Sequence, residues 1–348
     1  MRTPAPTVVT LPELPLDSGG SLRQAPVAFR TWGRLNDRGD NAVVVCHALT
    51  GDTDAAGWWS TLVGPGRLLD TDRLFVVCLN TLGSPYGSAS PLTVNPHTGQ
   101  AYGPEFPDVT IRDTVRAHRL VLAGLGVREV AFVIGGSMGG MLALEWAFHR
   151  HLVRSVAVVA AGGRHSPWSI AWGEAQRQAI FNDPDWREGH YAPERPPERG
   201  LAVARMMAMV SYRSSGEFEQ RFGRSRRSEG FEVESYLHHH GRKLNGRFDA
   251  NCYVALTRQM DSHDIGFGRG GYEAALDSLP QPALVVGIRS DVLYPLHEQV
   301  ELASLLPAGH LEVLSSPYGH DSFLVDHEAL TGAIAPFLSR HVYPYQLP

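Results

Sequence analysis

Residues 130–148 read VAFVIGGSMGGMLALEWAF, and this stretch decides the fold. It begins with an apolar run typical of a buried strand, turns through GGSMGG (135–140), and continues as a helix-forming segment. The pattern is G-x-S-x-G between a strand and a helix. Its glycines permit a turn that is too tight for larger side chains, and such a turn exposes the hydroxyl of Ser137 above the sheet. We therefore predict that Ser137 is a catalytic nucleophile.

Other short apolar runs predict the rest of that sheet. They are rich in β-branched residues and almost continuously hydrophobic, which is typical of parallel strands covered on both faces, and they span residues 42–46, 74–79, 155–160, 283–288 and 311–314. Helical stretches over residues 110–125 and 138–149 alternate with them. This order predicts an α/β fold with a doubly wound, mostly parallel sheet.

The alternation of strands and helices stops between residues 164 and 274. This segment is richer in Arg, Met, Tyr and His, contains no strand run, and reads as several helices. Because the strand pattern resumes at Ala283, we expect a helical cap inserted between two strands of one sheet. The core is then formed by residues 1–163 and 275–348.

A serine nucleophile needs a histidine base and an acid that orients this base, in the chain order serine, acid, histidine. Asp291 follows the predicted strand over residues 283–288, and His320 follows the last predicted strand. Open α/β sheets place their active sites at the carboxyl ends of the strands. The sequence therefore predicts the catalytic triad Ser137, Asp291 and His320.

Backbone N–H groups beside the serine would stabilise the negative charge that develops on a reacting carbonyl oxygen. One such group belongs to Met138, at the start of the helix after Ser137. A second lies in the loop HALTG (47–51), which has the form of an H-G-x-x-G loop with alanine in the second place. We predict Leu49 and Met138 as the oxyanion-hole donors, and Thr50 as a residue that lines the substrate pocket.

Composition excludes several other kinds of chemistry. The chain of 348 residues has 30 arginines but a single lysine, Lys243, which lies between Arg242 and Leu244. A Walker A loop needs lysine before serine or threonine, and a protein kinase needs a lysine on a strand, so neither is present. A Schiff base with pyridoxal phosphate would have only Lys243 available. The formal net charge of −5 argues against a protein that binds the phosphates of nucleic acids.

The three cysteines bear on where the protein works. Cys46, Cys78 and Cys252 show no C-x-x-C spacing, so we expect buried free thiols rather than a zinc site or a disulfide framework. We recognise no signal peptide and no apolar run long enough to cross a membrane. These features predict a cytoplasmic protein.

The chain resembles the homoserine O-acetyltransferase family of the α/β-hydrolase superfamily over about residues 25–340. The motifs that carry the resemblance include HALTGD (47–52), GGSMGGMLALEWA (135–147), MVSYRS (209–214), SYLHHHGRKLNGRFDANCYVALTRQMDSHD (235–264) and YGHDSFL (318–324). The resemblance implies an α/β-hydrolase fold and a two-step acetyl transfer in methionine biosynthesis. Acetyl-CoA would acylate Ser137, and the hydroxyl of L-homoserine would then attack the acyl-enzyme. It also implies no metal, no cofactor beyond the co-substrate acetyl-CoA, and a homodimer formed through the cap.

The same resemblance assigns two substrate-binding residues. Arg213 in SYRS and Asp321 in GHD match the positions that bind the amino acid in the family. Their chemistry is consistent with this role, because a guanidinium suits an α-carboxylate and a carboxylate suits an ammonium group.

Two stretches depart from the common family pattern. GSPY (83–86) stands where many members carry a Gly-Gly-Cys loop, and this form is also similar to homologues that resemble serine acetyltransferases. HHH (238–240) replaces a less basic stretch, and three consecutive histidines on a helix cannot all face one metal ion. Among the other histidines, His165, His190 and His297 are expected at the surface or at helix caps.

Three alternatives stay open at this point. The donor could be succinyl-CoA instead of acetyl-CoA, or the acceptor could be serine instead of homoserine, because a few pocket side chains decide each choice. The acceptor could also be water, as in an esterase or deacetylase, since the triad is the same. The third alternative is a protein of this fold that binds without catalysis, which the intact triad disfavours.

Overall fold

The computed structural model describes residues 4–228 and 230–345. Eight strands form one sheet in the order β1-β2-β6-β3-β7-β8-β11-β12. The strands span Thr7–Pro15 (β1), Ser21–Trp32 (β2), Ala42–Cys46 (β3), Phe75–Leu79 (β6), Val130–Gly136 (β7), Val156–Val159 (β8), Ala283–Ile288 (β11) and Gly309–Leu314 (β12). The six strands from β6 to β12 run parallel to one another, which confirms the predicted α/β fold.

The first two strands are not among those that the sequence predicts. β1 pairs with β2, and β2 pairs with β6, both in antiparallel fashion at one edge of the sheet. Because β1 is solvent-exposed along most of its length and contains Pro12, it lacks the continuous apolar run of a buried parallel strand.

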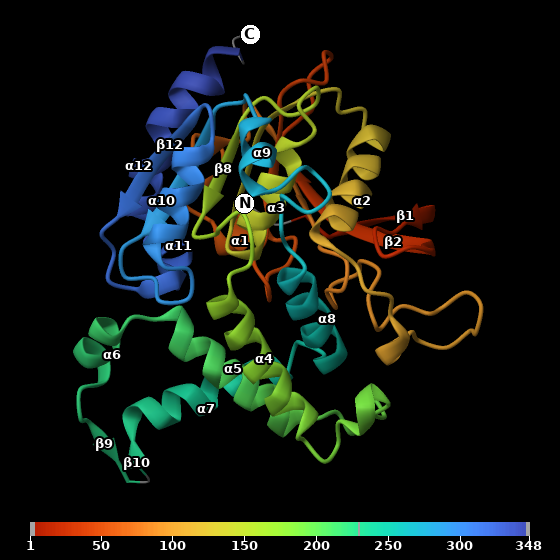
Figure 1. Cartoon of the computed structure of the whole chain (residues 1–348), viewed down its shortest axis with the longest axis vertical. Coiled ribbons are helices and arrows are strands. Elements are labelled where there is room, and N and C mark those ends of the chain that lie inside the picture. The colour runs from red at the N-terminus through yellow and green to blue at the C-terminus, as the bar shows by residue number, and fades with distance from the viewer. Residues whose placement is uncertain (1–3, 229, 346–348) are drawn as a thin grey trace.

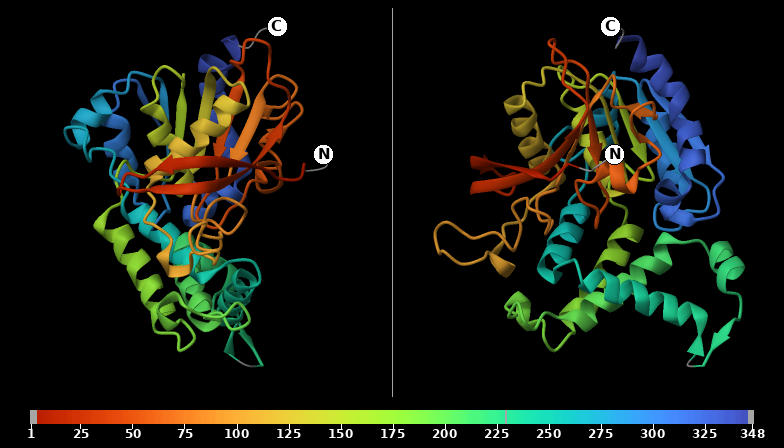
Figure 2. Two further views of the ribbon diagram at one scale, coloured as in Figure 1. Left: turned by 90° about the vertical axis from the view of Figure 1, so that its right-hand side faces the viewer. Right: turned by 180° about the vertical axis from the view of Figure 1, so that it is seen from behind.

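Helices cover both faces of the sheet, as Figures 1 and 2 show. Successive residues of a strand point to opposite faces, so Val44 belongs to one apolar cluster and Val43 to the other. The first face packs against α2 (Ile111–Gly124), α3 (Met138–Ala147), α9 (Tyr272–Asp277) and α10 (Leu296–Leu305). The second face packs against α1 (Ala55–Trp58), α11 (Ser322–Val325) and α12 (His327–His341). The sheet is thus doubly wound.

Between β8 and β11 the chain leaves the sheet and forms a layer of helices beneath it in Figure 1, which we call the cap. These helices are α4 (Pro167–Phe181), α5 (Glu198–Tyr212), α6 (Ser215–Phe222), α7 (Glu232–Asn245) and α8 (Ala250–Asp261). The expectation of an all-helical segment is wrong in one detail, because the short strands β9 (Arg226–Arg227) and β10 (Gly230–Phe231) pair between α6 and α7. Each is too short to give an apolar run.

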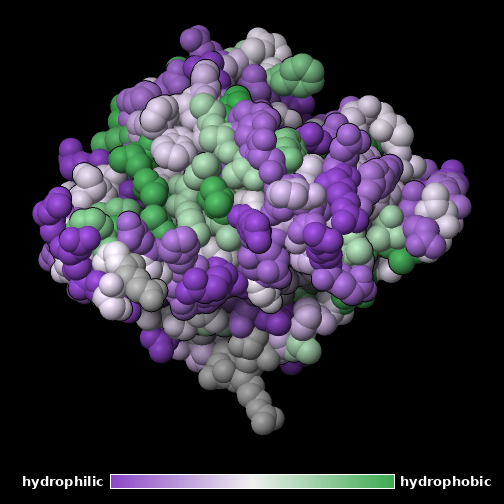
Figure 3. All heavy atoms as spheres, turned by 90° about the horizontal axis from the view of Figure 1, so that it is seen from below, coloured by the Kyte–Doolittle hydropathy of each residue, from purple (hydrophilic) through white to green (hydrophobic). Residues whose placement is uncertain are grey.

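The surface of the cap is uneven in polarity. Seen from below, apolar residues gather on one side of a mostly hydrophilic face (Figure 3). No helix in the described part of the chain is long and apolar enough to cross a membrane. Cys46, Cys78 and Cys252 are buried free thiols, as expected.

Candidate active site

Ser137 occupies a strained turn between β7 and α3. Its backbone has φ 59° and ψ −125°, a left-handed conformation that is unfavourable for a residue with a side chain. The turn is packed too tightly for larger neighbours, because a Cβ atom added to Gly139 would lie 2.2 Å from the carbonyl oxygen of Cys46. The hydroxyl of Ser137 does not cap α3, although the residue stands at the N-cap position. This hydroxyl is therefore available for catalysis.

Asp291 and His320 lie together at the carboxyl ends of β11 and β12. Asp291 Oδ2 is 2.6 Å from His320 Nδ1. Asp291 Oδ1 accepts hydrogen bonds from the N–H groups of Leu293 (2.8 Å) and Tyr294 (2.9 Å), so the carboxylate is fixed in orientation. His320 Nε2 is buried and has no hydrogen-bond partner among the described residues. Because Nδ1 carries the proton donated to Asp291, Nε2 is the nitrogen that can accept one.

The carboxylate also sets the proton affinity of the imidazole. Burial lowers the pKa of His320, but the charge and the hydrogen bond of Asp291, together with the charge of Asp321, raise this pKa above its ordinary value of 6.5. A base with a raised pKa takes up a proton from a serine hydroxyl more readily.

Three aromatic rings surround the imidazole of His320. Tyr294 stacks on it with ring centroids 5.2 Å apart, Tyr212 lies at 5.7 Å, and Phe323 meets it nearly edge-on at 5.5 Å. Phe323 also reaches the serine turn, because a Cβ atom added to Gly136 would lie 2.5 Å from its ring. The ring of Phe323 thus links the base to the turn that carries the nucleophile. Sequence reasoning misses all three aromatic residues.

The two predicted oxyanion donors belong to neighbouring loops. Cys46, at the end of β3, is paired with Gly135 of β7, so the loop that contains Leu49 starts beside the serine turn. The carbonyl of Ser137 accepts the N–H groups of Gly140 and Met141. The N–H of Met138, at the first position of α3, has no acceptor within the helix.

His47 holds the Leu49 loop in place. Its Nε2 accepts the N–H of Thr81 at 3.1 Å, so Nδ1 carries the proton and donates to the carbonyl of Ala48 at 2.8 Å. Burial lowers the pKa of His47, which keeps the ring neutral and preserves this pattern.

Arg213 and Asp321, to which the resemblance assigns the binding of the amino acid, lie close together. Arg213 follows α5, Asp321 directly follows His320, and Arg213 Nε lies 3.3 Å from Asp321 Oδ2 without an aligned hydrogen bond. Burial raises the pKa of Asp321, while Arg213 and His320 act in the opposite direction. Two opposite charges beside the base, with hydrogen-bonding capacity to spare, suit a zwitterionic ligand.

Thr50 makes its described contacts with the cap. Its carbonyl accepts from Arg247 Nη1 at 2.8 Å, and its hydroxyl lies 3.4 Å from Nη2 of the same residue. Neither contact involves Arg213 or Asp321, so the role of Thr50 as a pocket residue stays a prediction. Arg247 also donates to the hydroxyl of Tyr86, which belongs to the unusual GSPY stretch.

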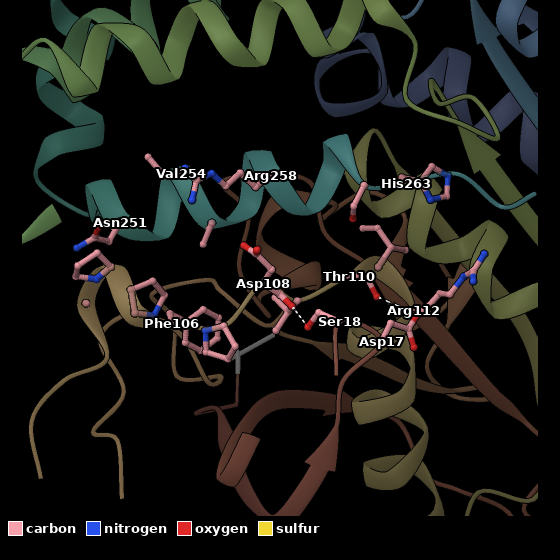
Figure 4. A pocket seen from close by; sticks show the side chains of 18 of the residues that line it. Asp17, Ser18, Phe106, Asp108, Thr110, Arg112, Asn251, Val254, Arg258 and His263 are labelled. Atoms are coloured by element: carbon pink, nitrogen blue, oxygen red, sulfur yellow. Dashed lines mark hydrogen bonds between the residues drawn. The ribbon is translucent and has the colours of Figure 1, made fainter. Parts of the chain in front are cut away.

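Figure 4 shows a large cavity of about 870 Å³. It is lined on one side by α8 and on the other by the loop that carries Phe106 and Asp108. No member of the predicted triad lines it. A much smaller cavity of about 30 Å³ is lined by Leu49 and by Tyr212 and Tyr294, two of the rings that surround the base.

The described residues offer no cluster of three or more histidine, cysteine or acidic side chains that could hold a metal ion. Within the three consecutive histidines of α7, the ring of His240 packs against Tyr236 with centroids 4.4 Å apart.

Comparison with known proteins places this chain. A family model described as the alpha/beta hydrolase fold matches residues 41–327. A homoserine O-acetyltransferase of Salinibacter ruber is 60% identical over 94% of this chain and 96% of its own. Another, of Trichormus variabilis, is 51% identical over 92% of this chain and 90% of its own. The chain belongs to the homoserine O-acetyltransferase family. This confirms the resemblance drawn from the sequence motifs.

Solved structures similar to this member of the homoserine O-acetyltransferase family include both a homoserine O-acetyltransferase and an esterase. A homoserine O-acetyltransferase from Bacillus anthracis superposes with a TM-score of 0.91 at 26% identity, over 98% of this chain and 99% of its own. The structure of esterase E22 superposes with a TM-score of 0.90 at 27% identity, over 96% and 99%. The scaffold is therefore shared across its whole length, and pocket side chains must separate the two activities.

Proposed function

We propose that this chain is an acyltransferase that moves the acetyl group of acetyl-CoA to the hydroxyl of L-homoserine, a step of methionine biosynthesis. The observation that carries the proposal is the partly buried pair Arg213 and Asp321 beside His320, in a chain 60% identical to a homoserine O-acetyltransferase. A hydrolase needs the triad, but it has no use for a guanidinium and a carboxylate arranged for an amino acid.

In the first step, the hydroxyl of Ser137 attacks the thioester carbonyl carbon of acetyl-CoA. His320 Nε2 takes the hydroxyl proton and delivers it to the departing sulfur, so CoA leaves as the thiol. The N–H groups of Leu49 and Met138 stabilise the negative oxygen of the tetrahedral intermediate. Asp291 holds the imidazole in the required tautomer and stabilises its protonated form.

In the second step, the hydroxyl of homoserine attacks the acetyl group on Ser137. His320 accepts the proton of this hydroxyl and returns it to the oxygen of Ser137, which restores the free enzyme. Arg213 binds the α-carboxylate of homoserine, and Asp321 binds its ammonium group. The reaction needs no metal and no cofactor beyond the co-substrate.

Hydrolysis is the second candidate, because the fold matches esterase E22 with a TM-score of 0.90. Release of CoA distinguishes the two candidates when acetyl-CoA and succinyl-CoA are each combined with homoserine, serine or no acceptor. We expect sustained release only with acetyl-CoA and homoserine, and none with the Ser137→Ala variant. Equal release without an acceptor would favour the esterase. Sustained release with serine or with succinyl-CoA would instead change the assigned substrate.

Exposed apolar residues of the cap support a homodimer, and the buried free thiols support a location in the cytoplasm. Val203 and Val210 stand two turns apart on one side of α5, with 41% and 44% of their surface exposed, and Trp168 of α4 is 51% exposed. Figure 3 shows apolar residues gathered on one side of the cap face. A second copy of the chain would cover such a patch.

A further inference from the structure

The loop that follows Asp291 is attached to the first helix of the cap. The indole N–H of Trp168 donates to the carbonyl of Val292 at 2.7 Å. The hydroxyl of Ser169 donates to the carbonyl of Leu293 at 3.0 Å. These bonds join the start of α4 to the segment that carries the catalytic acid, so the position of that segment depends on the cap.

A third link between this loop and the cap is a chain of hydrogen bonds between side chains, which we call the relay. His165 Nε2 lies 3.1 Å from the hydroxyl of Tyr294, and His165 Nδ1 lies 3.1 Å from Asp261 Oδ1. Asp261 Oδ2 is held in turn by Arg177 at 2.7 Å. Because the carboxylate accepts the Nδ1 proton, Nε2 accepts the proton of the Tyr294 hydroxyl. Asp261, His165 and Tyr294 thus form a second array of carboxylate, imidazole and hydroxyl.

The expectation that His165 lies at the surface or caps a helix is wrong. The residue is 9% exposed, and it sits where the chain enters the cap. Its N–H donates to the carbonyl of His263, and the N–H of Ile265 donates to the carbonyl of Gly163. The first and last segments of the cap are therefore bonded to each other at the point where the relay begins.

Tyr294 connects this relay to the catalytic base. Its ring stacks on the imidazole of His320 at 5.2 Å with an interplanar angle of 30°, and its N–H donates to Asp291 Oδ1. The side chain is completely buried, so its hydroxyl cannot meet a substrate as a second nucleophile. Burial also raises the pKa of Tyr294, which keeps the phenol protonated and able to donate.

We infer that Tyr294 is a positioning residue whose hydroxyl, held by His165 and Asp261, keeps the imidazole of His320 aligned with Asp291 when the cap is docked. The relay makes the geometry of the triad depend on the segments that join the cap to the rest of the chain. This inference rests on the proposed acetyl transfer, but it concerns only how the imidazole of His320 is positioned.

The test compares Tyr294→Phe, His165→Leu and the double variant. Each removes the same hydrogen bond, while Tyr294→Phe keeps the stacked ring. We expect kcat to fall about 10- to 100-fold, with the KM for acetyl-CoA unchanged, because a displaced base slows chemistry more than binding. The double variant should be no slower than His165→Leu, since the bond that Tyr294→Phe removes is already absent there. His165→Gln, which can still accept the phenol proton, should recover most of the rate.

A matched control is Tyr343→Phe, which removes a hydroxyl bonded to the carbonyl of Leu68, away from the triad. The second readout is the low-field proton resonance of His320 Nδ1–H in the bond to Asp291. It should shift or broaden in Tyr294→Phe and His165→Leu but not in Tyr343→Phe. If Tyr294→Phe fails to fold, His165→Leu carries the same test, because the phenol ring stays in the core.

Two results would overturn the inference: a wild-type kcat with an unchanged resonance in Tyr294→Phe, or losses that multiply in the double variant. The acylation burst with 4-nitrophenyl acetate is measured alongside, since it needs the triad but not the natural substrates. A wild-type protein that shows the burst but does not acetylate homoserine would refute the proposed function, and the variants would still decide the role of Tyr294.

Discussion

At the scale of single residues, the contact between Asp291 and His320 determines the strength of the base. The pKa of His320 is raised by Asp291 against the effect of burial. In Asp291→Asn the raising effect of Asp291 is lost, while burial still lowers the pKa and only the charge of Asp321 still raises it. We therefore expect the acidic limb of the acylation rate to move to lower pH. The maximal rate should fall by about 10³- to 10⁴-fold, because the imidazole also loses its tautomer. A pH series of the acylation burst measures both. An acidic limb that stays in place would mean that another group titrates.

A second prediction at this scale concerns Arg213. In Arg213→Ala the KM for homoserine should rise about 10- to 100-fold, the amount expected when a charged hydrogen-bond partner is removed. Acylation of Ser137 by acetyl-CoA should change little. Arg221→Ala is the matched control, because Arg221 also lies beside Glu217 but is more exposed. Equal losses in both half-reactions would assign Arg213 a structural role.

The sequence predicts those site residues whose position in the fold follows from chain order. Asp291 and His320 are predictable because each stands just after a strand, and the carboxyl ends of parallel strands share one edge. Tyr212 and Tyr294 are not predictable in this way. They meet at His320 from a cap helix and from the acid loop, and neither spacing nor composition reports such packing.

At the scale of elements, the loop before His320 packs tightly against the end of α5. Gly319 has φ +65°, and a Cβ atom added there would lie 2.5 Å from the carbonyl carbon of Arg213. The hydroxyl of Ser214 donates to the carbonyl of Pro317, which fixes the same contact. The loop and the cap therefore depend on each other for their position.

Gly319→Ala tests this contact. Backbone strain alone should cost about 1–3 kcal/mol of unfolding free energy, and the clash should move Arg213 away from Asp321. We expect the homoserine half-reaction to lose more activity than acylation does. Gly332→Ala is the control, because a Cβ atom there meets nothing within 4 Å and α12 favours alanine. Chemical denaturation and half-reaction rates measure the two effects, and a fully active Gly319→Ala protein would contradict the account.

The sequence predicts some helices and strands well and others not at all. β3 and β11 have the predicted bounds, because a buried parallel strand is a continuous apolar run. The edge strand β1 lacks such a run, since most of its residues face solvent. The bounds of the cap stay a prediction, while the helices between β8 and β11 agree with the pattern that suggested it.

At the scale of the whole molecule, the cap is proposed to carry the dimer contact as well as Arg213. Changing both Val203 and Val210 to glutamate should convert a dimer into a monomer, because charges would replace the apolar patch on α5. Sedimentation velocity measures the mass. Phe267→Glu is the control, since this side chain is 76% exposed at a distance from α5 in the chain. A mass that does not change would place the dimer contact elsewhere.

The central claim is that Ser137 carries the acetyl group between the two substrates. It is tested most directly by intact-protein and peptide mass spectrometry after acetyl-CoA is added without an acceptor, and again after homoserine is added. The account predicts one acetyl group on the peptide that contains Ser137, its rapid loss to homoserine with formation of O-acetylhomoserine, and no label in Ser137→Ala. An acetyl group on another residue, or loss to water as fast as to homoserine, would contradict it.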